Sequence, residues 1–289
     1  MSVIYIGYPR LGSKFVYSGG DWETARPVTN VANDSYARAA RSVDLDAENT
    51  VIELSSQDRR PVKLLGIFAH NMTLAAGFRV TCIDDTVSPA EVLFQSPIEQ
   101  VWEIVFETQE RLFETDNWFT GQYTEDELAG QIPSRPYVLP DGIAPSKIIV
   151  EFFDALNPDG FIDIGLLEVA GAISLESGER PELGSEWGYV SESNITRIVG
   201  GLQKAEIYDP SYVFRGVLPL VPNIKAKQAL AELSRQYGQH RPFMWFPYPE
   251  DALTYLRESK MVLLSDDVLL SIISDRRQSI PLALKEWKG

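Results

Sequence analysis

The chain has 289 residues, 44% of them hydrophobic, so it is long enough to bury a substantial core and is globular rather than disordered. Its 26 basic and 41 acidic residues give a net charge of −15, which repels phosphate backbones and argues against a nucleic-acid partner. No apolar run reaches the length of a membrane span, and the first residues lack the pattern of a secretory signal. We therefore expect a protein made in a cytoplasm, without membrane insertion.

Two pairs of strands dominate the first half of the chain. Residues 62–84 contain a segment that is apolar on both faces, a short polar turn, and then an alternating strand that includes Cys82. Residues 147–169 repeat this arrangement around an Asn-Pro-Asp-Gly turn. The patterns predict two hairpins that pair with each other within a β-sandwich.

Between these strand pairs, residues 107–145 carry aromatic residues, prolines and acids without a clean periodicity, and we interpret them as a long inserted loop region. Four of the aromatic residues form the candidate contact site: Trp118, Phe119, Tyr123 and Tyr137. Exposed rings anchor protein interfaces and also form platforms for sugar rings. The sequence leaves three alternatives open, namely an interface, a glycan site, and ordinary packing beneath the loop.

A change of composition divides the chain. Residues 174–194 are rich in Ser, Gly, Glu and Pro, which indicates a linker between a first domain at 1–173 and a second at 195–289. In the second domain, residues 224–237 predict one main helix, because their apolar residues recur on one stripe. Strand patterns flank this helix on both sides, so we expect a small α+β assembly domain.

Few residues offer catalytic chemistry. His70 and His240 are the only histidines and Cys82 is the only cysteine, which excludes an intramolecular disulfide and a His-rich or Cys-rich metal site. A nucleophilic pair of Cys82 and His70 is conceivable, but the alternation of its strand places Cys82 in the core. Paired acids are ordinary in turns, and a glycosidase needs two carboxylates that face each other across a cleft. We expect no enzymatic activity and no cofactor.

One segment has the spacing of part of a calcium loop. Asn157, Asp159 and Gly160 match the pattern, but the positions that should supply a carboxylate and a bidentate glutamate are Ala155 and Leu166. We therefore interpret these residues as a hairpin turn and expect no metal.

Several motifs carry a family resemblance. The segments Asn33-Asp34-Ser35, TVIEL, VKLLGIFAHNM and FRVTCIDD resemble the galactose-binding-like, discoidin-type β-sandwich. The segments NPDGFIDIGLLEVAG, RIVGG and LALKEW are similar to virion proteins of the tail tip of long-tailed bacteriophages. Where the sandwich family usually has an Asp-Leu-Gly run, this chain has Ile52-Glu53-Leu54, so no ligand residue is transferred from that family.

The resemblance implies a mainly β fold, with a galactose-binding-like jelly-roll β-sandwich followed by the small α+β domain. It implies a structural subunit of a bacteriophage tail tip or baseplate, synthesised in the host bacterial cytoplasm and located in the virion. Its partners would be other phage tail proteins and copies of itself, arranged with rotational symmetry about the tail axis. The alternative function is a carbohydrate-binding module that contacts a glycan of the host cell envelope.

Overall fold

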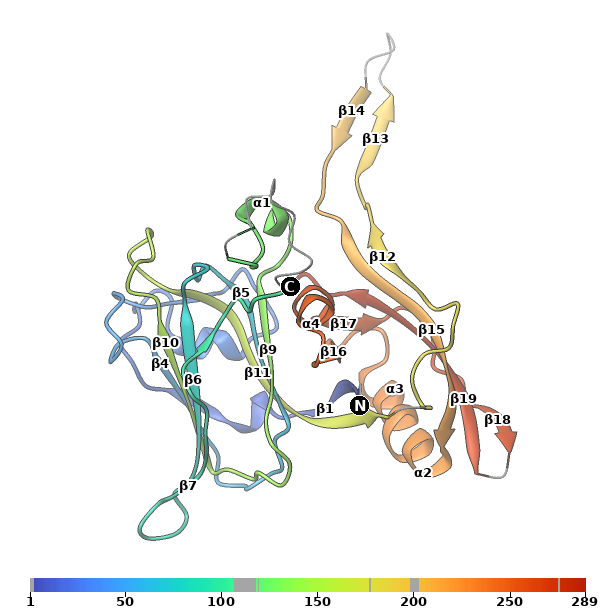
Figure 1. Cartoon of the computed structure of the whole chain (residues 1–289), viewed down its shortest axis with the longest axis horizontal. Helices are drawn as coiled ribbons and strands as arrows, with labels where there is room; N and C mark the ends of the chain where they lie inside the picture. Colours follow the sequence, from blue (N-terminus) through green and yellow to red (C-terminus); the bar gives the residue numbers. More distant parts are fainter. Residues whose placement is uncertain (1–2, 107–117, 119, 177, 198–202, 275) are drawn as a thin grey trace.

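The computed structural model describes residues 3–106, 118, 120–176, 178–197, 203–274 and 276–289. Figure 1 shows a β-sandwich built from the first part of the chain and, beside it, a second part that contains the main helix and a projecting pair of strands. The predicted fold class is confirmed: the chain is mainly β, with a sandwich followed by a smaller part that mixes strands and helix.

One sheet of the sandwich has six strands. Along its main path they are β2 (Val16–Ser18), β4 (Val51–Ser55), β10 (Lys147–Phe153), β6 (Gly77–Asp84) and β7 (Glu91–Gln95), and β8 (Glu99–Gln100) pairs with β6. Burial alternates residue by residue along β4 and β10, because each strand turns one face to the core and the other to solvent.

The other sheet has eleven strands and runs through both parts of the molecule. Its main path is β12 (Glu186–Val190), β15 (Ser211–Pro222), β19 (Arg277–Glu286), β17 (Lys260–Leu264), β16 (Phe243–Pro247), β1 (Ile4–Arg10), β11 (Asp163–Leu175), β5 (Leu64–His70) and β9 (Ser134–Val138). In addition, β18 (Ser271–Ser274) pairs with β19 and β3 (Ala40–Arg41) pairs with β11. A separate two-stranded sheet consists of β13 (Asn194–Arg197) and β14 (Gln203–Glu206).

The main helix lies where the sequence predicts it. It runs through α2 (Asn223–Lys225), the π-helical turn η3 (Ala226–Leu230) and α3 (Ala231–Tyr237), and its predicted apolar stripe is buried: Ala226, Leu230, Leu233 and Tyr237. The other helices are α1 (Glu125–Leu128) and α4 (Ala252–Glu258), with 3₁₀ turns η1 (Gly12–Lys14) and η2 (Val28–Ala32). Among the described residues, each helix is too short or too polar to cross a membrane.

The two predicted hairpins are wrong in one respect, because the strands of each lie in opposite sheets. β5 belongs to the eleven-stranded sheet and β6 to the six-stranded one, and β11 and β10 are divided in the same way. The two segments nevertheless pair with each other as predicted, β10 with β6 and β11 with β5. Alternation along a strand is the same in a hairpin and in a sheet-to-sheet corner, so it does not reveal which sheet a strand joins.

β5 is buried on both faces, as its apolar run predicts, because each face has its own partner. Leu65 and Ile67 lie in the sandwich core. Leu64 and Phe68 lie in a smaller cluster with buried residues of β16 and α4, namely Met244, Phe246 and Tyr255. The outer face of the sandwich is therefore the surface on which the second part packs.

The predicted division into domains stays a prediction, but the structure shows that one strand of the predicted first domain pairs with a strand of the predicted second domain. β1, at the start of the chain, pairs with β16 and places Ile4 and Ile6 in the core of the second part. Residues 174–194, predicted as a linker, include the strand β12, and the predicted loop region 107–145 includes α1 and β9.

Candidate functional site

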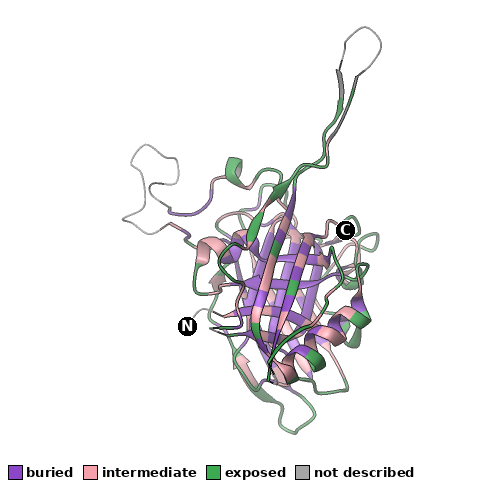
Figure 2. Ribbon diagram, turned by 90° about the vertical axis from the view of Figure 1, so that its right-hand side faces the viewer, coloured by how far each residue is buried: buried purple, intermediate pink, exposed green. Residues whose placement is uncertain are grey.

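The feature that stands apart from the body is an arm, defined here as residues 186–197 and 203–210. Figures 1 and 2 show it projecting from the edge of the eleven-stranded sheet. At its base, β12 pairs with β15, with Tyr189 opposite Tyr212 and their rings edge-on at 6.1 Å. Further out, the hydroxyl of Ser193 accepts a hydrogen bond from the Tyr208 N–H at 3.0 Å. This bond joins the outgoing and the returning segment of the arm, and beyond it β13 pairs with β14.

Charged contacts fix the arm base to the body. The Lys285 ammonium of β19 donates to the Glu192 carboxylate, and this contact lowers the pKa of Glu192. The Lys288 ammonium donates to the backbone carbonyl of Pro210 at 3.2 Å. The arm therefore leaves the body in a defined direction, set by the sheet and by these contacts.

The arm exposes large apolar side chains. The exposed fractions are 55% for Trp187, 50% for Val190, 83% for Ile207 and 56% for Tyr208. We call these four residues the arm surface. Soluble proteins scatter single apolar residues over their surface, but four of them exposed on one projecting element make the arm a candidate contact site for another macromolecule. No motif in the sequence identified this surface, although the alternation of Trp187 and Tyr189 with Glu186 and Gly188 is typical of a strand.

The predicted aromatic site is divided between different parts of the structure. Trp118 is half-buried, and Phe119 lies outside the described residues. Tyr123 is buried, packs edge-on against Phe106 at 5.9 Å and donates to the Leu253 carbonyl at 3.3 Å, and burial raises its pKa to about 12.

Tyr137 lies in the sandwich, in a different cluster from Tyr123. Its ring is edge-on to Phe78 at 5.5 Å, and its hydroxyl donates to Glu99 Oε1 at 3.1 Å. Burial, with the neighbouring Glu99 carboxylate, raises the pKa of Tyr137 to about 12. Tyr123 and Tyr137 are thus used in packing inside the chain, and the contact role predicted for Trp118 stays a prediction.

The one conceivable nucleophilic pair is unsuited to catalysis. Cys82 is fully buried, as predicted, and burial raises the pKa of its thiol to about 12, so the thiol stays protonated at neutral pH. Burial, and then the nearby Arg135 guanidinium, lower the pKa of His70 to about 3, so its ring is neutral. The two residues also lie in strands of opposite sheets.

The calcium-like segment forms a turn held by its own side chains. The Asn157 amide donates to Asp154 Oδ2 at 2.9 Å and to the Asn71 carbonyl at 3.1 Å, and Gly160 has a φ of +76°, which suits glycine. Within the described ranges, no group of three or more His, Cys, Asp or Glu side chains could hold a metal ion.

A buried ion-pair network joins the sandwich to the second part. Glu168 of β11 accepts from Arg10 Nε at 2.9 Å and from the Gly12 N–H at 2.8 Å. Arg10 also donates from Nη1 to Asp34 Oδ2 at 3.1 Å, and its backbone N–H donates to the Tyr237 hydroxyl at 2.9 Å. Burial raises the pKa of Glu168, and the Arg10 charge opposes that rise. The carboxylate is satisfied within the fold, so we assign it a structural role.

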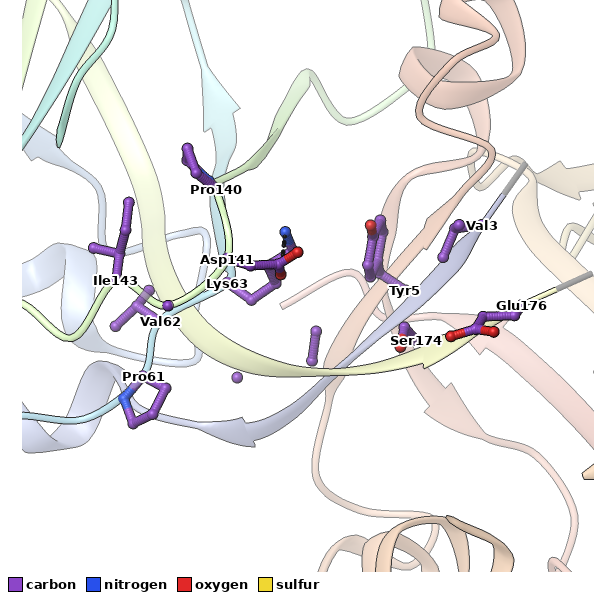
Figure 3. A pocket seen from close by; sticks show the side chains of 13 residues that line it. Val3, Tyr5, Pro61, Val62, Lys63, Pro140, Asp141, Ile143, Ser174 and Glu176 are labelled. Atoms are coloured by element: carbon purple, nitrogen blue, oxygen red, sulfur yellow. Dashed lines mark ion pairs between the residues drawn. The ribbon is translucent and has the colours of Figure 1, made fainter. Parts of the chain in front are cut away.

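A cavity of about 350 Å³ lies where β1 and β11 leave the sandwich. Figure 3 shows the Lys63–Asp141 ion pair beside the Tyr5 ring of β1, with Ser174 of β11 and Glu176, which follows that strand, below the ring in this view. The Lys63 ammonium is 2.8 Å from Asp141 Oδ1 and 5.7 Å from the centre of the Tyr5 ring. An aromatic ring bordered by hydrogen-bonding groups can hold a small polar ligand.

Comparisons with known proteins identify no family. Neither a protein-family model nor a curated protein matches the sequence. Among solved structures, the chain is similar to the family 32 carbohydrate-binding module from C. perfringens NanJ in complex with galactose, with 12% identity and a TM-score of 0.37. This likeness covers 58% of the chain and 99% of the module, and at that TM-score it supports no argument about ligand or activity.

Proposed function

We propose that this chain is a non-enzymatic structural subunit of a larger assembly, and specifically of the tail tip or baseplate of a bacteriophage. The observation that carries the proposal is the projecting arm with its exposed arm surface. In an isolated chain Ile207 is 83% exposed and Trp187 is 55% exposed, so the free energy that burial of their apolar surface would contribute is not gained. In an assembly, a neighbouring subunit would cover these side chains.

Two further observations support the proposal. Three short segments that resemble virion proteins of phage tail tips lie between residues 157 and 287, namely NPDGFIDIGLLEVAG, RIVGG and LALKEW. The eleven-stranded sheet continues from the sandwich to the base of the arm, as suits a building block that holds its neighbours in place.

The test is to locate the chain in particles. Phage particles from cells that produce this protein would be purified by density gradient and labelled with antibody against the sandwich. We expect label at the distal end of the tail, and the protein in the mass spectrum of the particles at a constant ratio to the tail tube protein. Abundant free protein in the lysate, with none in purified particles, would refute the assignment.

The second candidate is carbohydrate binding, which the cavity beside Tyr5 favours. The faces of aromatic rings pack against the apolar faces of sugars, while Lys63 and Asp141 could exchange hydrogen bonds with hydroxyl groups. Galactose, whose ring has an apolar face and several hydroxyl groups, is the first probe, followed by cell-envelope polysaccharides.

This candidate is tested by titration calorimetry and NMR with the intact chain. We expect binding to be lost in Tyr5→Ala and weakened in Asp141→Asn, whose side chain is 95% exposed and therefore dispensable for folding. Tyr208→Ala, which removes an exposed ring on the arm, is the matched control and should bind like the wild type. Equal binding by Tyr5→Ala and the wild type would exclude this cavity as the site.

A further inference from the structure

A second cavity, of about 480 Å³, lies at the base of the arm. Residues of β12, β15, β16 and α4 line it, together with residues 181–185, which precede β12. These strands and this helix are labelled in Figure 1. The cavity shares no lining residue with the one beside Tyr5, and we call it the arm-base cavity.

A row of aromatic rings leads from the core to this cavity. Trp187 of β12 lies directly opposite Phe214 of β15, and directly opposite residues project from the same face of a sheet. The centre of the Phe214 ring lies 5.1 Å from the centre of the Trp245 ring of β16. Phe214 and Trp245 are buried, whereas Trp187 is 55% exposed, and all three line the cavity. The row therefore begins in the core and ends at an exposed ring.

A fourth aromatic ring comes from the turn between β16 and α4. Tyr248 has a φ of +45°, which is uncommon for a bulky residue, and the Asp251 N–H donates to its carbonyl at 2.9 Å. Both residues line the cavity. The turn thus brings an aromatic ring and a carboxylate to the same space.

α4 turns an acidic face to the cavity. Asp251, Thr254 and Glu258 are three and four residues apart, a spacing that places them on one face of a helix, and all three line the cavity. Glu258 is 8% exposed, and its Oε2 accepts from the Tyr212 hydroxyl at 3.0 Å. Burial raises the pKa of Glu258, the Tyr212 hydrogen bond opposes this rise, and the nearby Asp251 charge adds to it. A further carboxylate, that of Glu182, lines the cavity from the loop before β12.

These three carboxylates have no cation to balance them. Among the described residues that line the cavity there is no Lys, Arg or His, and none of the three carboxylates forms an ion pair within the part of the chain that the structure describes. Arg257 precedes Glu258 but lines a different, smaller cavity, and Arg180 lies near Tyr248 without lining this one. A buried carboxylate is costly unless a cation or hydrogen bonds compensate it. The faces of aromatic rings also attract cations, so rings and acids together favour a positively charged ligand.

We propose that the arm-base cavity binds an organic cation, supplied as a lysine or arginine side chain of a protein partner. This inference rests on the proposed function, because it names the chemistry of one contact that an assembly subunit makes. Glu258 Oε1, the carboxylate oxygen to which Tyr212 does not donate, would accept from the ammonium or guanidinium group, and the exposed Trp187 ring would cover it. The net charge of −15 also attracts a basic partner.

The test is an NMR titration of the intact chain, followed at the indole N–H signals of Trp187 and Trp245. The probes are Nα-acetyl-arginine N-methylamide and the corresponding lysine derivative. The citrulline derivative is the control, because it has nearly the shape of arginine without its charge. Galactose is titrated in parallel, since a neutral sugar can also pack on an aromatic ring.

Two variants and a control locate the binding site. Glu258→Gln removes the charge but can still accept from Tyr212, and Trp187→Ala removes the exposed ring. Glu91→Gln removes the same charge from an exposed position on β7, in the other sheet, and is the matched control. Circular dichroism and urea unfolding verify that the variants fold, and Trp187→Ala decides the question if Glu258→Gln does not.

We expect the arginine and lysine derivatives to shift the indole signals in a saturable manner, and the citrulline derivative and galactose to leave them unchanged. Glu258→Gln should weaken binding about tenfold or more, because it removes the buried charge that faces the cation. Trp187→Ala should weaken binding about threefold or more, because it removes an aromatic face. Glu91→Gln should bind like the wild type.

Four results would overturn the proposal. They are no shift with either basic derivative at the highest soluble concentration, equal shifts by the arginine and citrulline derivatives, saturable binding of galactose alone, and binding that neither Glu258→Gln nor Trp187→Ala weakens. Each of these leaves the tail-tip assignment standing if the chain is still found in purified particles. Conversely, selective binding of the basic derivatives by a chain that is absent from particles would refute only the assignment to a phage.

Discussion

His70 should make the stability of this protein fall in mild acid. The ring is 4% exposed, lies 5.4 Å from the Trp102 ring, and has no hydrogen-bond partner for either nitrogen among the described residues. Burial, followed by the charge of Arg135, lowers its pKa to about 3. The unfolded chain binds a proton at this histidine below a pKa of about 6.5, while the folded chain stays unprotonated until the pH approaches 3.

The sign and the magnitude follow from this difference. Between pH 6.5 and pH 3 the unfolded state binds more protons than the folded state, so the free energy of unfolding decreases as the pH falls. Relative to pH 8, the loss that His70 causes is about 2 kcal/mol at pH 5 and about 3 kcal/mol at pH 4. This is a large part of the stability of an ordinary domain.

The test compares urea unfolding of the wild type and His70→Phe at pH 8, 6.5 and 5. Phenylalanine keeps a flat ring beside Trp102 but binds no proton, so the variant should gain about 2 kcal/mol relative to the wild type between pH 8 and pH 5. His240→Phe is the matched control, since His240 is exposed and solvent reaches it in both states. Parallel pH profiles for His70→Phe and the wild type would refute the reasoning.

Three further predictions concern the sandwich core and the junction, by which we mean the contact between the sandwich and the second part. Glu168→Gln removes the charge that faces Arg10, and should lower the free energy of unfolding by about 2 kcal/mol in urea titrations; an unchanged midpoint would contradict a structural role. Phe68→Ala opens a cavity between the sandwich and the second part and should cost about 3–5 kcal/mol, against almost nothing for Leu156→Ala at the surface; similar losses for both would show that the junction is not packed. Cys82 should resist alkylation in the native chain and react fully in urea, and rapid native labelling would disprove its burial.

Local pattern identified most of the strands of the sandwich, but not their connections. The alternation of Phe78, Val80 and Cys82 shows one buried face, and the apolar run of β5 shows two. Whether successive strands fold back on each other or cross to the opposite sheet depends on which faces must be covered. The second face of β5 is covered by β16 and α4, which lie some 180 residues further along the chain, so the local sequence does not reveal this packing.

The aromatic residues show the same limit. Loop composition placed Trp118, Tyr123 and Tyr137 together as a candidate contact site, but side chains that are close in sequence can enter different clusters. Tyr123 packs near Leu256 of α4, while Tyr137 packs in the sandwich. The exposed apolar residues of the arm lie instead in and beside a segment that reads as a linker because it is rich in Ser, Gly and Glu.

The sequence by itself determined the mainly β class, the helix at 224–237 and the buried state of Cys82, because periodicity and composition report how much of each face is covered. Only the tertiary structure decided that one sheet runs through both parts of the molecule, that β1 packs in the core of the second part, and that the arm projects from the body. These are matters of which segments meet, and long-range pairing depends on the summed burial of many residues rather than on any one stretch.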